Sequence, residues 1–175
     1  MRRHMFTVAA VLAVGIGALV AAELTKVGFT RSTIDLGVIV GNLERSAKFY
    51  TEALGFTEIE GFSAGADVAG ESGLTAFKPL TVRVFVLADE PSATRLKLME
   101  FPDGQPKKID TQYLHSTLGY RYLTLHVADT SASVSRAKAA GVEPVKPPYH
   151  LGGGTWLTLV RDPDGNIIEF VGPKK

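Results

Sequence analysis

The 175-residue chain contains no cysteine. It can form no disulfide, carries no cysteine nucleophile and offers no thiolate to a metal ion, so its fold must be held by an apolar core alone. An excess of charge of one sign is also missing, because 19 Lys and Arg stand against 18 Asp and Glu. This balance gives no electrostatic footprint for nucleic acid, and we expect no nucleic-acid partner.

The first 22 residues differ in kind from the rest. A basic start at Arg2-Arg3-His4 precedes an uncharged, mostly apolar run that ends in Val20-Ala21-Ala22. This order is typical of a secretory signal cleaved after Ala22 and predicts an exported protein, periplasmic or secreted. The alternative is an uncleaved anchor that tethers the protein to a membrane, because residues 5–22 can just span a bilayer. Residues 23–175 are then a single domain.

The rest of the chain repeats one order of elements. In the first half, β-branched and alternating patterns predict four strands, at 34–40, 56–62, 80–87 and 95–101. A helix over 43–54 begins after the N-cap residue Asn42 and ends at Gly55. A connector, 102–119, is punctuated by prolines. The second half predicts strands at 120–127, 142–145, 155–160 and 166–171, with a helix from Asp129 or Thr130 through Ala140.

The two halves can be aligned with each other. Asp35 matches Tyr122 with a spacing of 87 residues, and each half ends in an acid followed by an aromatic residue, at Glu100 and Glu169. Neither half can bury its apolar face alone. We therefore predict an α+β fold of two βαβββ modules, about 33–101 and 120–172, that pair into one core. The same alignment predicts that Glu100 and Glu169 occupy equivalent positions.

Two motifs resemble the vicinal oxygen chelate superfamily, which includes glyoxalase I, bleomycin-resistance proteins and extradiol dioxygenases. The first is Val38-x-Val40-x-Asn42-Leu43-x-x-Ser46-x-x-Phe49-Tyr50, followed by Leu54-Gly55-Phe56, and the second is Arg161-Asp-Pro-Asp-Gly-Asn166-x-x-Glu169-Phe170. The resemblance covers about residues 33–172 and implies a cup-shaped, curved mixed sheet. It also implies a divalent metal in many members, bound by the first and last strand of each module. The motifs are specific for the fold and weak for any one activity.

Carried over residue by residue, the resemblance implies a metal site with an unusual set of ligands. The first-strand positions hold Asp35 and Tyr122, where the metal enzymes of the family usually have His. The ligands of such a site are Asp35, Glu100 and Glu169, completed by His126 or by Tyr122. Oxygen ligands favour hard ions, and the predicted cofactor is Mg²⁺, Mn²⁺, Ca²⁺ or an iron ion. The alternative is that these acids pair with Arg83 or Arg121, or are hydrated.

The pocket residues follow from strand alternation combined with the resemblance. Tyr122, Thr124 and His126 lie on one face of their predicted strand, which the resemblance makes the pocket face. Tyr122 and Thr124 are the substrate-binding residues that this predicts. Trp156 is added to them by residue type, because an aromatic side chain can form an apolar pocket wall; the alternative is that Trp156 belongs to the core. Glu169 is the predicted general base, and His126 is either a proton shuttle or a pocket-lining residue with a satisfied hydrogen bond.

Three hypotheses for function stay open on the sequence. The first is an exported lyase, isomerase or dioxygenase that acts on a small oxygen-rich molecule with the help of a divalent metal. The second is a metal-free protein that binds or sequesters a small molecule, as bleomycin-resistance proteins do in this fold. The third is an interaction domain whose pocket has lost its chemistry. The resemblance also predicts a homodimer, because proteins of this family often are dimers.

Overall fold

The computed structural model describes residues 28–104 and 106–175. Residues 31–175 form one compact unit, which contains every helix and strand that is described. The signal or anchor predicted for residues 1–22 lies outside the described residues. Within the described part, no helix has both the length and the apolar character that crossing a membrane requires.

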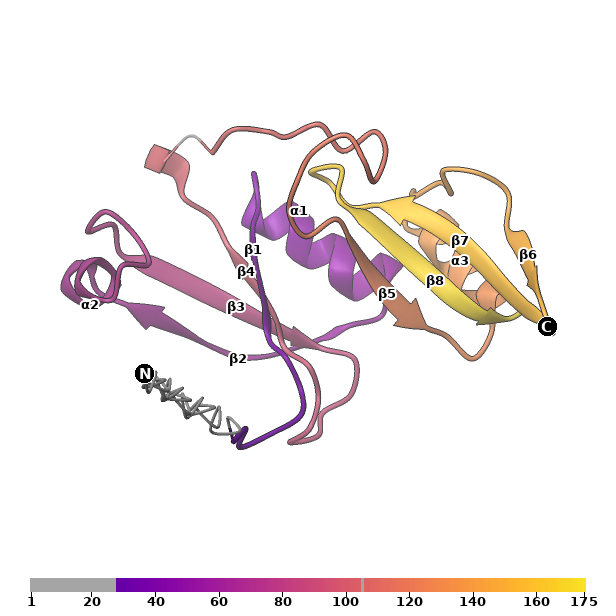
Figure 1. Ribbon diagram of the computed structural model, residues 1–175, viewed down its shortest axis with the longest axis horizontal. Coiled ribbons are helices and arrows are strands. Elements are labelled where there is room, and N and C mark those ends of the chain that lie inside the picture. The colour runs from indigo at the N-terminus through magenta and orange to yellow at the C-terminus, as the bar shows by residue number, and fades with distance from the viewer. Residues whose placement is uncertain (1–27, 105) are drawn as a thin grey trace, which may run out of the picture. The chain divides into compact units, whose positions relative to one another are not determined.

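Module one is a four-stranded mixed sheet in the order β1-β4-β3-β2 (Figure 1). Its strands are β1 (Leu36–Ile39), β2 (Thr57–Ala64), β3 (Leu80–Val86) and β4 (Leu96–Met99). Its helical segments are α1 (Leu43–Lys48), the π-helical η1 (Phe49–Ala53) and α2 (Ala66–Glu71). β1 runs parallel to β4, and the other two pairings are antiparallel. The Asn42 side chain accepts a hydrogen bond from the Arg45 N–H at 2.8 Å and caps α1, as predicted.

Module two repeats this arrangement after the connector, with strand order β5-β8-β7-β6. Its elements are β5 (Tyr122–His126), α3 (Thr130–Ala139), β6 (Tyr149–Gly152), β7 (Thr155–Arg161) and β8 (Ile167–Pro173). The connector contains a short 3₁₀ turn, η2 (Pro102–Gly104). β5 is parallel to β8, as β1 is to β4. The predicted α+β fold with two βαβββ modules is confirmed.

One predicted strand is wrong. Residues 142–145 do not form a strand. The second strand of module two is β6, which starts at Tyr149. Val145 makes a single sheet-like contact, donating its N–H to the Leu159 carbonyl oxygen at 2.8 Å. Pro147-Pro148 follow it and supply no N–H donor, so pairing with β7 begins only after them.

Each sheet has two faces with different surroundings, which we name by what covers them. The inner face packs against α1, η1 and α3, and the outer face is the opposite one, which in module one carries a second buried cluster of Ala69 from α2 with Leu80, Val82 and Val84. Inner-face side chains of both sheets share one buried cluster with the helices: Phe85, Leu96, Leu98, Leu125, Val160, Ile168 and Phe170. The two modules therefore bury one common core, as the duplicated pattern predicts.

The turn between β7 and β8 forms hydrogen bonds with module one. The buried Asp162 carboxylate accepts a hydrogen bond from the Tyr50 hydroxyl at 3.2 Å, and Asp164 accepts one from the Gly41 N–H at 3.0 Å. Burial, followed by the negative charge of Asp162, raises the pKa of the Tyr50 hydroxyl well above its ordinary value. The Arg161–Asn166 motif thus serves the contact between modules.

Candidate functional site

The register of the paired strands decides which residues of the two modules correspond. In module two, Thr124 of β5 lies opposite Glu169 of β8, and in module one Gly37 of β1 lies opposite Lys97 of β4. Gly37 and Thr124 are related by the same spacing of 87 residues that aligns the two first strands. Lys97, and not Glu100, therefore occupies the position of Glu169.

The prediction that Glu100 matches Glu169 is wrong. The two acids are aligned by their following aromatic residues, but Glu100 lies three residues beyond the equivalent position. An odd shift moves a side chain to the other face of a sheet. Glu100 accordingly lies on the inner side, where its carboxylate accepts a hydrogen bond from the Leu43 N–H at 2.8 Å. It satisfies a free donor at the start of α1.

The outer face of module one carries an ion-paired cluster. The Asp35 Oδ2 lies 2.8 Å from an Arg31 guanidinium nitrogen and 2.9 Å from the Lys97 Nζ. Asp35 Oδ1 is buried and has no hydrogen-bond partner among the described residues. The Lys97 ammonium, with Arg31 adding to it, holds the pKa of the Asp35 carboxyl below its ordinary value, although burial acts in the opposite direction. Asp35 is thus already neutralised by protein cations.

The outer face of module two gathers the residues predicted for the pocket. The Thr124 hydroxyl donates a hydrogen bond to Glu169 at 2.7 Å. Tyr122 and His126 flank Thr124 on the same face of β5, and both are exposed. This face therefore presents a carboxylate, a phenol and an imidazole together, in the arrangement that alternation predicts.

Trp156 lies on the other side of the sheet. It pairs with Gly172 and alternates with the buried Thr158 and Val160, so it lies on the inner face. Its ring is 4.9 Å from the His150 ring and 4.6 Å from the Lys174 Nζ. The structure does not bring Trp156 together with Tyr122 and Thr124. Trp156 lies two and four positions from the buried Thr158 and Val160 along β7, so its side chain shares their face and not the outer one.

Comparison with known proteins identifies the family of this chain. The model of the Glyoxalase/Bleomycin resistance protein/Dioxygenase superfamily matches residues 33–170. The chain belongs to this superfamily. No curated protein sequence matches the chain.

Solved structures from the glyoxalase superfamily share the fold. A glyoxalase family protein from Bacillus cereus is 22% identical, with a TM-score of 0.70 over 87% of this chain and 99% of that one. The trypanothione-dependent glyoxalase I of Leishmania major is 26% identical, with a TM-score of 0.59 over 82% of this chain and 87% of that one. A glyoxalase/bleomycin resistance protein/dioxygenase domain from Frankia sp. is 18% identical, with a TM-score of 0.56 over 85% and 93% of the two chains.

Members of the glyoxalase superfamily often use divalent metals, but the side chains at the matching strand positions of the described residues do not fit such an ion. Among residues 28–104 and 106–175, no three His, Asp or Glu side chains lie close enough to hold a metal. The first- and last-strand positions hold Asp35, Lys97, Tyr122 and Glu169. An ammonium group has no lone pair for a metal, and a carboxylate paired with it is a poor ligand.

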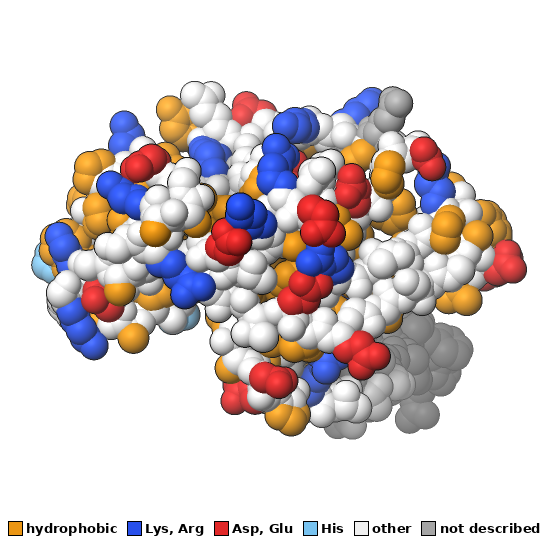
Figure 2. Space-filling view, turned by 180° about the vertical axis from the view of Figure 1, so that it is seen from behind, with side chains coloured by type: hydrophobic (Ala, Val, Ile, Leu, Met, Phe, Trp, Pro, Cys, Tyr) orange, Lys and Arg blue, Asp and Glu red, His pale blue; other side chains and the backbone are white. Residues whose placement is uncertain are grey.

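The arginines considered as partners for the predicted ligands have other contacts. Arg83 pairs with Glu58 and Glu44, on the inner side of module one, at 2.6 and 2.8 Å. Arg121 donates to three connector carbonyl oxygens, those of Asp110, Tyr113 and Leu114. Neither arginine neutralises the acids of the outer faces. Over the face shown in Figure 2, basic and acidic side chains lie interspersed.

A cavity of about 210 Å³ lies along β1 and the start of β5. Its lining includes Gly37 and Ile39 of module one and Tyr120, Tyr122 and Leu123 of module two. Tyr122 therefore contributes both to the outer face and to this cavity. Apolar walls with a few polar groups at the rim are typical of small-molecule sites.

Proposed function

We propose that this superfamily member binds a small organic molecule on its outer faces and does so without a metal ion. The observation that carries the proposal is Lys97, which occupies the position of Glu169 in the other module and lies 2.9 Å from Asp35. A resident ammonium at a metal-ligand position supplies the positive charge that a divalent ion would supply. Binding of a small molecule then needs only the side chains of the chain itself.

The outer faces have the composition of a small-molecule site. Exposed aromatic side chains, Tyr122 in module two and Phe62 in module one, lie beside a few polar groups. Aromatic surface supplies most of the contact area for a ligand, and a small number of fixed polar groups orients it. Glu169 and Thr124 can accept and donate hydrogen bonds to hydroxyl or carbonyl groups of such a ligand.

The second candidate is a metal-assisted lyase, isomerase or dioxygenase. It is favoured by one observation, that Glu169 and His126, two of the four predicted ligands, share the outer face of module two. In that case Glu169 and His126 would hold the ion, and the ion would polarise a substrate oxygen. Asp35 and Glu100 would take no part, because one is ion-paired and the other lies on the inner side.

The two candidates differ in one measurement. We expect elemental analysis of the purified protein to find no stoichiometric metal, and Mg²⁺, Mn²⁺, Ca²⁺, Zn²⁺ or Ni²⁺ to leave the melting temperature unchanged. A panel of small carboxylic acids, diols and aromatic compounds should contain members that raise it, because a ligand that binds only the folded state stabilises it. A metal-induced rise that disappears in Glu169→Gln would establish the second candidate instead.

We further propose that the protein is exported. The support is the basic start and apolar run of residues 1–22, which lie outside the described residues. Expression of the full chain with a C-terminal tag, followed by cell fractionation and mass spectrometry, tests this. A mature N-terminus at Glu23 in the exported fraction is expected, whereas an intact N-terminus in the membrane fraction would indicate an anchor.

Pairing of two copies is a separate proposal. It is supported by superfamily membership, since members are often dimers, and by the exposed apolar side chains of the outer faces. Light scattering during gel filtration should give the mass of two chains. The mass of a single chain at all concentrations tested would reject the proposal.

A further inference from the structure

Lys97 belongs to an ion-pair cluster, and its ammonium group has donors that no described residue uses. One of its three N–H groups faces Asp35, the sole ion-pair partner that Lys97 has among the described residues. Asp35 is shared with Arg31, so two cations meet one carboxylate and the cluster keeps one net positive charge. The Lys97 side chain is 28% exposed. Its remaining donors are therefore within reach of a ligand.

An irregularity in β2 places an aromatic ring beside this ammonium. Ile59 pairs with Val84 and Phe62 pairs with Val82, so three residues of β2 span two residues of β3. This is a β-bulge, and it returns Phe62 to the outer face, where regular alternation would have turned it inward. The Phe62 ring centroid lies 5.9 Å from the Lys97 Nζ, at the outer limit of a cation–π contact.

Glycine makes the bulge possible. A Cβ on Gly61 would overlap the Val82 carbonyl oxygen, so a side chain at this position would push β2 away from β3. The Phe62 side chain remains 51% exposed beside the cation. An exposed aromatic ring next to a partly free ammonium combines an apolar platform with an anchor for negative charge.

We propose that Lys97 is the resident cation of the binding site and that Lys97 and Phe62 together recognise a small apolar or aromatic carboxylate. The ligand carboxylate accepts hydrogen bonds from the two free donors of the ammonium, and the ligand body lies on the Phe62 ring. Such charge-assisted bonds are about twice as strong as neutral ones. The inference rests on the proposed function and adds the chemical class of the ligand.

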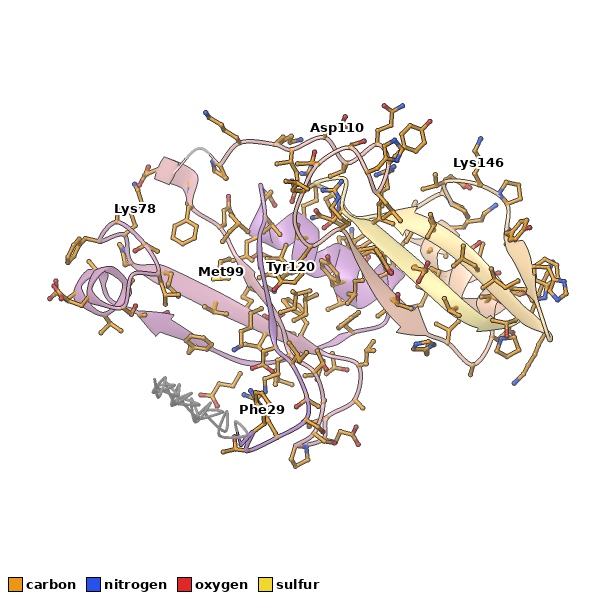
Figure 3. The ribbon with its side chains drawn as sticks, in the orientation of Figure 1. Phe29, Lys78, Met99, Asp110, Tyr120 and Lys146 are labelled. Atoms are coloured by element: carbon orange, nitrogen blue, oxygen red, sulfur yellow. The ribbon has the colours of Figure 1, made fainter. Side chains whose placement is uncertain are left out.

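The first test compares benzoate with benzamide, which has the same size and no charge. Calorimetric or NMR titration of the full chain should show that benzoate binds roughly tenfold more tightly. Lys97→Met keeps the aliphatic stem and should remove this preference. Lys78→Met removes the same charge from an exposed lysine of the loop after α2 (Figure 3) and should retain it. Equal binding of the two probes, or equal losses in the two variants, would overturn the proposal.

A second variant tests whether the ammonium takes the place of a metal. Lys97→Glu puts a carboxylate at the position of Glu169, next to Asp35. Mn²⁺ at ten times its dissociation constant should then raise the melting temperature by about 3 °C, while the wild type should not respond. Adding Asp35→Asn to Lys97→Glu should abolish the response. A wild-type response that Asp35→Asn removes, or no response in Lys97→Glu, would contradict the inference.

Failure of this inference differs from failure of the proposed function. If neutral compounds bind and Lys97→Met leaves their affinity unchanged, then the protein binds small molecules and Lys97 is not the recognition group. If no member of the panel binds the wild type, then the proposed function itself fails. Melting curves of each variant, measured without ligand, show whether the fold is intact.

Discussion

The two modules share a backbone plan but differ in the charges on their outer faces. Module one has the Lys97 ammonium beside Asp35, and module two has the Glu169 carboxylate beside the neutral Thr124 hydroxyl. On the inner faces the equivalent positions, Leu98 and Phe170, are both apolar and fully buried. The common core constrains the inner face of both copies. The outer faces differ, because that of module one carries a second buried cluster (Ala69, Leu80, Val82 and Val84) beside the ion pair, whereas that of module two carries the Glu169 carboxylate.

The last hairpins of the modules show a second difference. The turn between β7 and β8 contains Asp162, which is 4% exposed and accepts hydrogen bonds from both modules. The corresponding turn between β3 and β4 contains Asp89, which is exposed. Only the turn of module two therefore has a carboxylate that the fold depends on. The following variants separate acids that support the fold from acids on the outer faces.

Removal of the buried carboxylate should have the largest effect. Asp162→Ala leaves four donors without their acceptor: the Tyr50 hydroxyl, the N–H groups of Asp164 and Asn166, and the Asn166 side-chain amide. We expect the free energy of unfolding to fall by about 3 kcal/mol. Asp89→Ala, the matched change in module one, should stay within about 0.5 kcal/mol. Urea denaturation measures both, and equal losses would contradict the comparison.

Tyr50→Phe should have an intermediate effect that depends on pH. At neutral pH it should cost about 1 kcal/mol, the typical value of one hydrogen bond. Burial and Asp162 raise the pKa of Tyr50, so the neutral phenol stabilises the fold fully below about pH 10, and this contribution is lost as the pH rises further. The wild type should lose about 1.4 kcal/mol per pH unit there through this group.

The Tyr50→Phe variant should lack this alkaline loss, which urea denaturation at a series of pH values would show. The exposed Tyr149 serves as the control, because Tyr149→Phe should change neither the neutral stability nor the alkaline slope. Parallel stability curves for wild type and Tyr50→Phe above pH 10 would show that the buried phenol does not govern this loss.

Glu100 and Glu169 each precede an aromatic residue, but they should contribute differently to stability. Glu100→Ala removes the acceptor for the Leu43 N–H at the start of α1 and should cost about 1 kcal/mol. The Glu169 side chain lies on the outer face. Glu169→Ala should therefore cost less than about 0.5 kcal/mol, because water can replace the carboxylate beside Thr124. Thermal unfolding compares them. A larger loss for Glu169→Ala would refute the assignment of Glu100 to the fold and Glu169 to the ligand face.

Asp35→Asn should have a small effect on stability that depends on pH. Lys97 and Arg31 lower the pKa of Asp35, so its contribution is present above about pH 4 and is lost as the pH falls below that value. Because Asp35 lies in an ion pair near the surface, we expect a loss of about 0.5 kcal/mol at neutral pH. Acid unfolding should show a shallower loss of stability in the variant. An unchanged acid slope would mean that the ion pair does not form in solution.

Sequence patterns were informative where a local rule applies. Asn42 caps α1, and Gly55 follows the helical segment with φ of 86°, both as the sequence predicts. Alternation correctly predicts the shared face of Tyr122, Thr124 and His126. The position of Trp156 was predicted by residue type alone, and residue type does not specify a face of the sheet.

The error over Glu100 has a different physical origin. An acid followed by an aromatic residue recurs at the end of both halves, but module one has Lys97-Leu98 at the positions of Glu169-Phe170. The signal that could have found this is the buried Leu96 and Leu98 pair, whose period of two requires Lys97 to face outward. The β-bulge at Gly61 gives no such signal, since it depends on how β2 meets β3.

The sequence alone determined the α+β class, the duplication of the βαβββ module and the superfamily, because these depend on periodicity, caps and motifs that lie close together along the chain. The tertiary structure decided which residues face each other across β1 and β4, and so replaced a predicted carboxylate with the Lys97 ammonium. Strand register is set by packing between segments that are distant in sequence, and a shift of an odd number of residues exchanges core for surface.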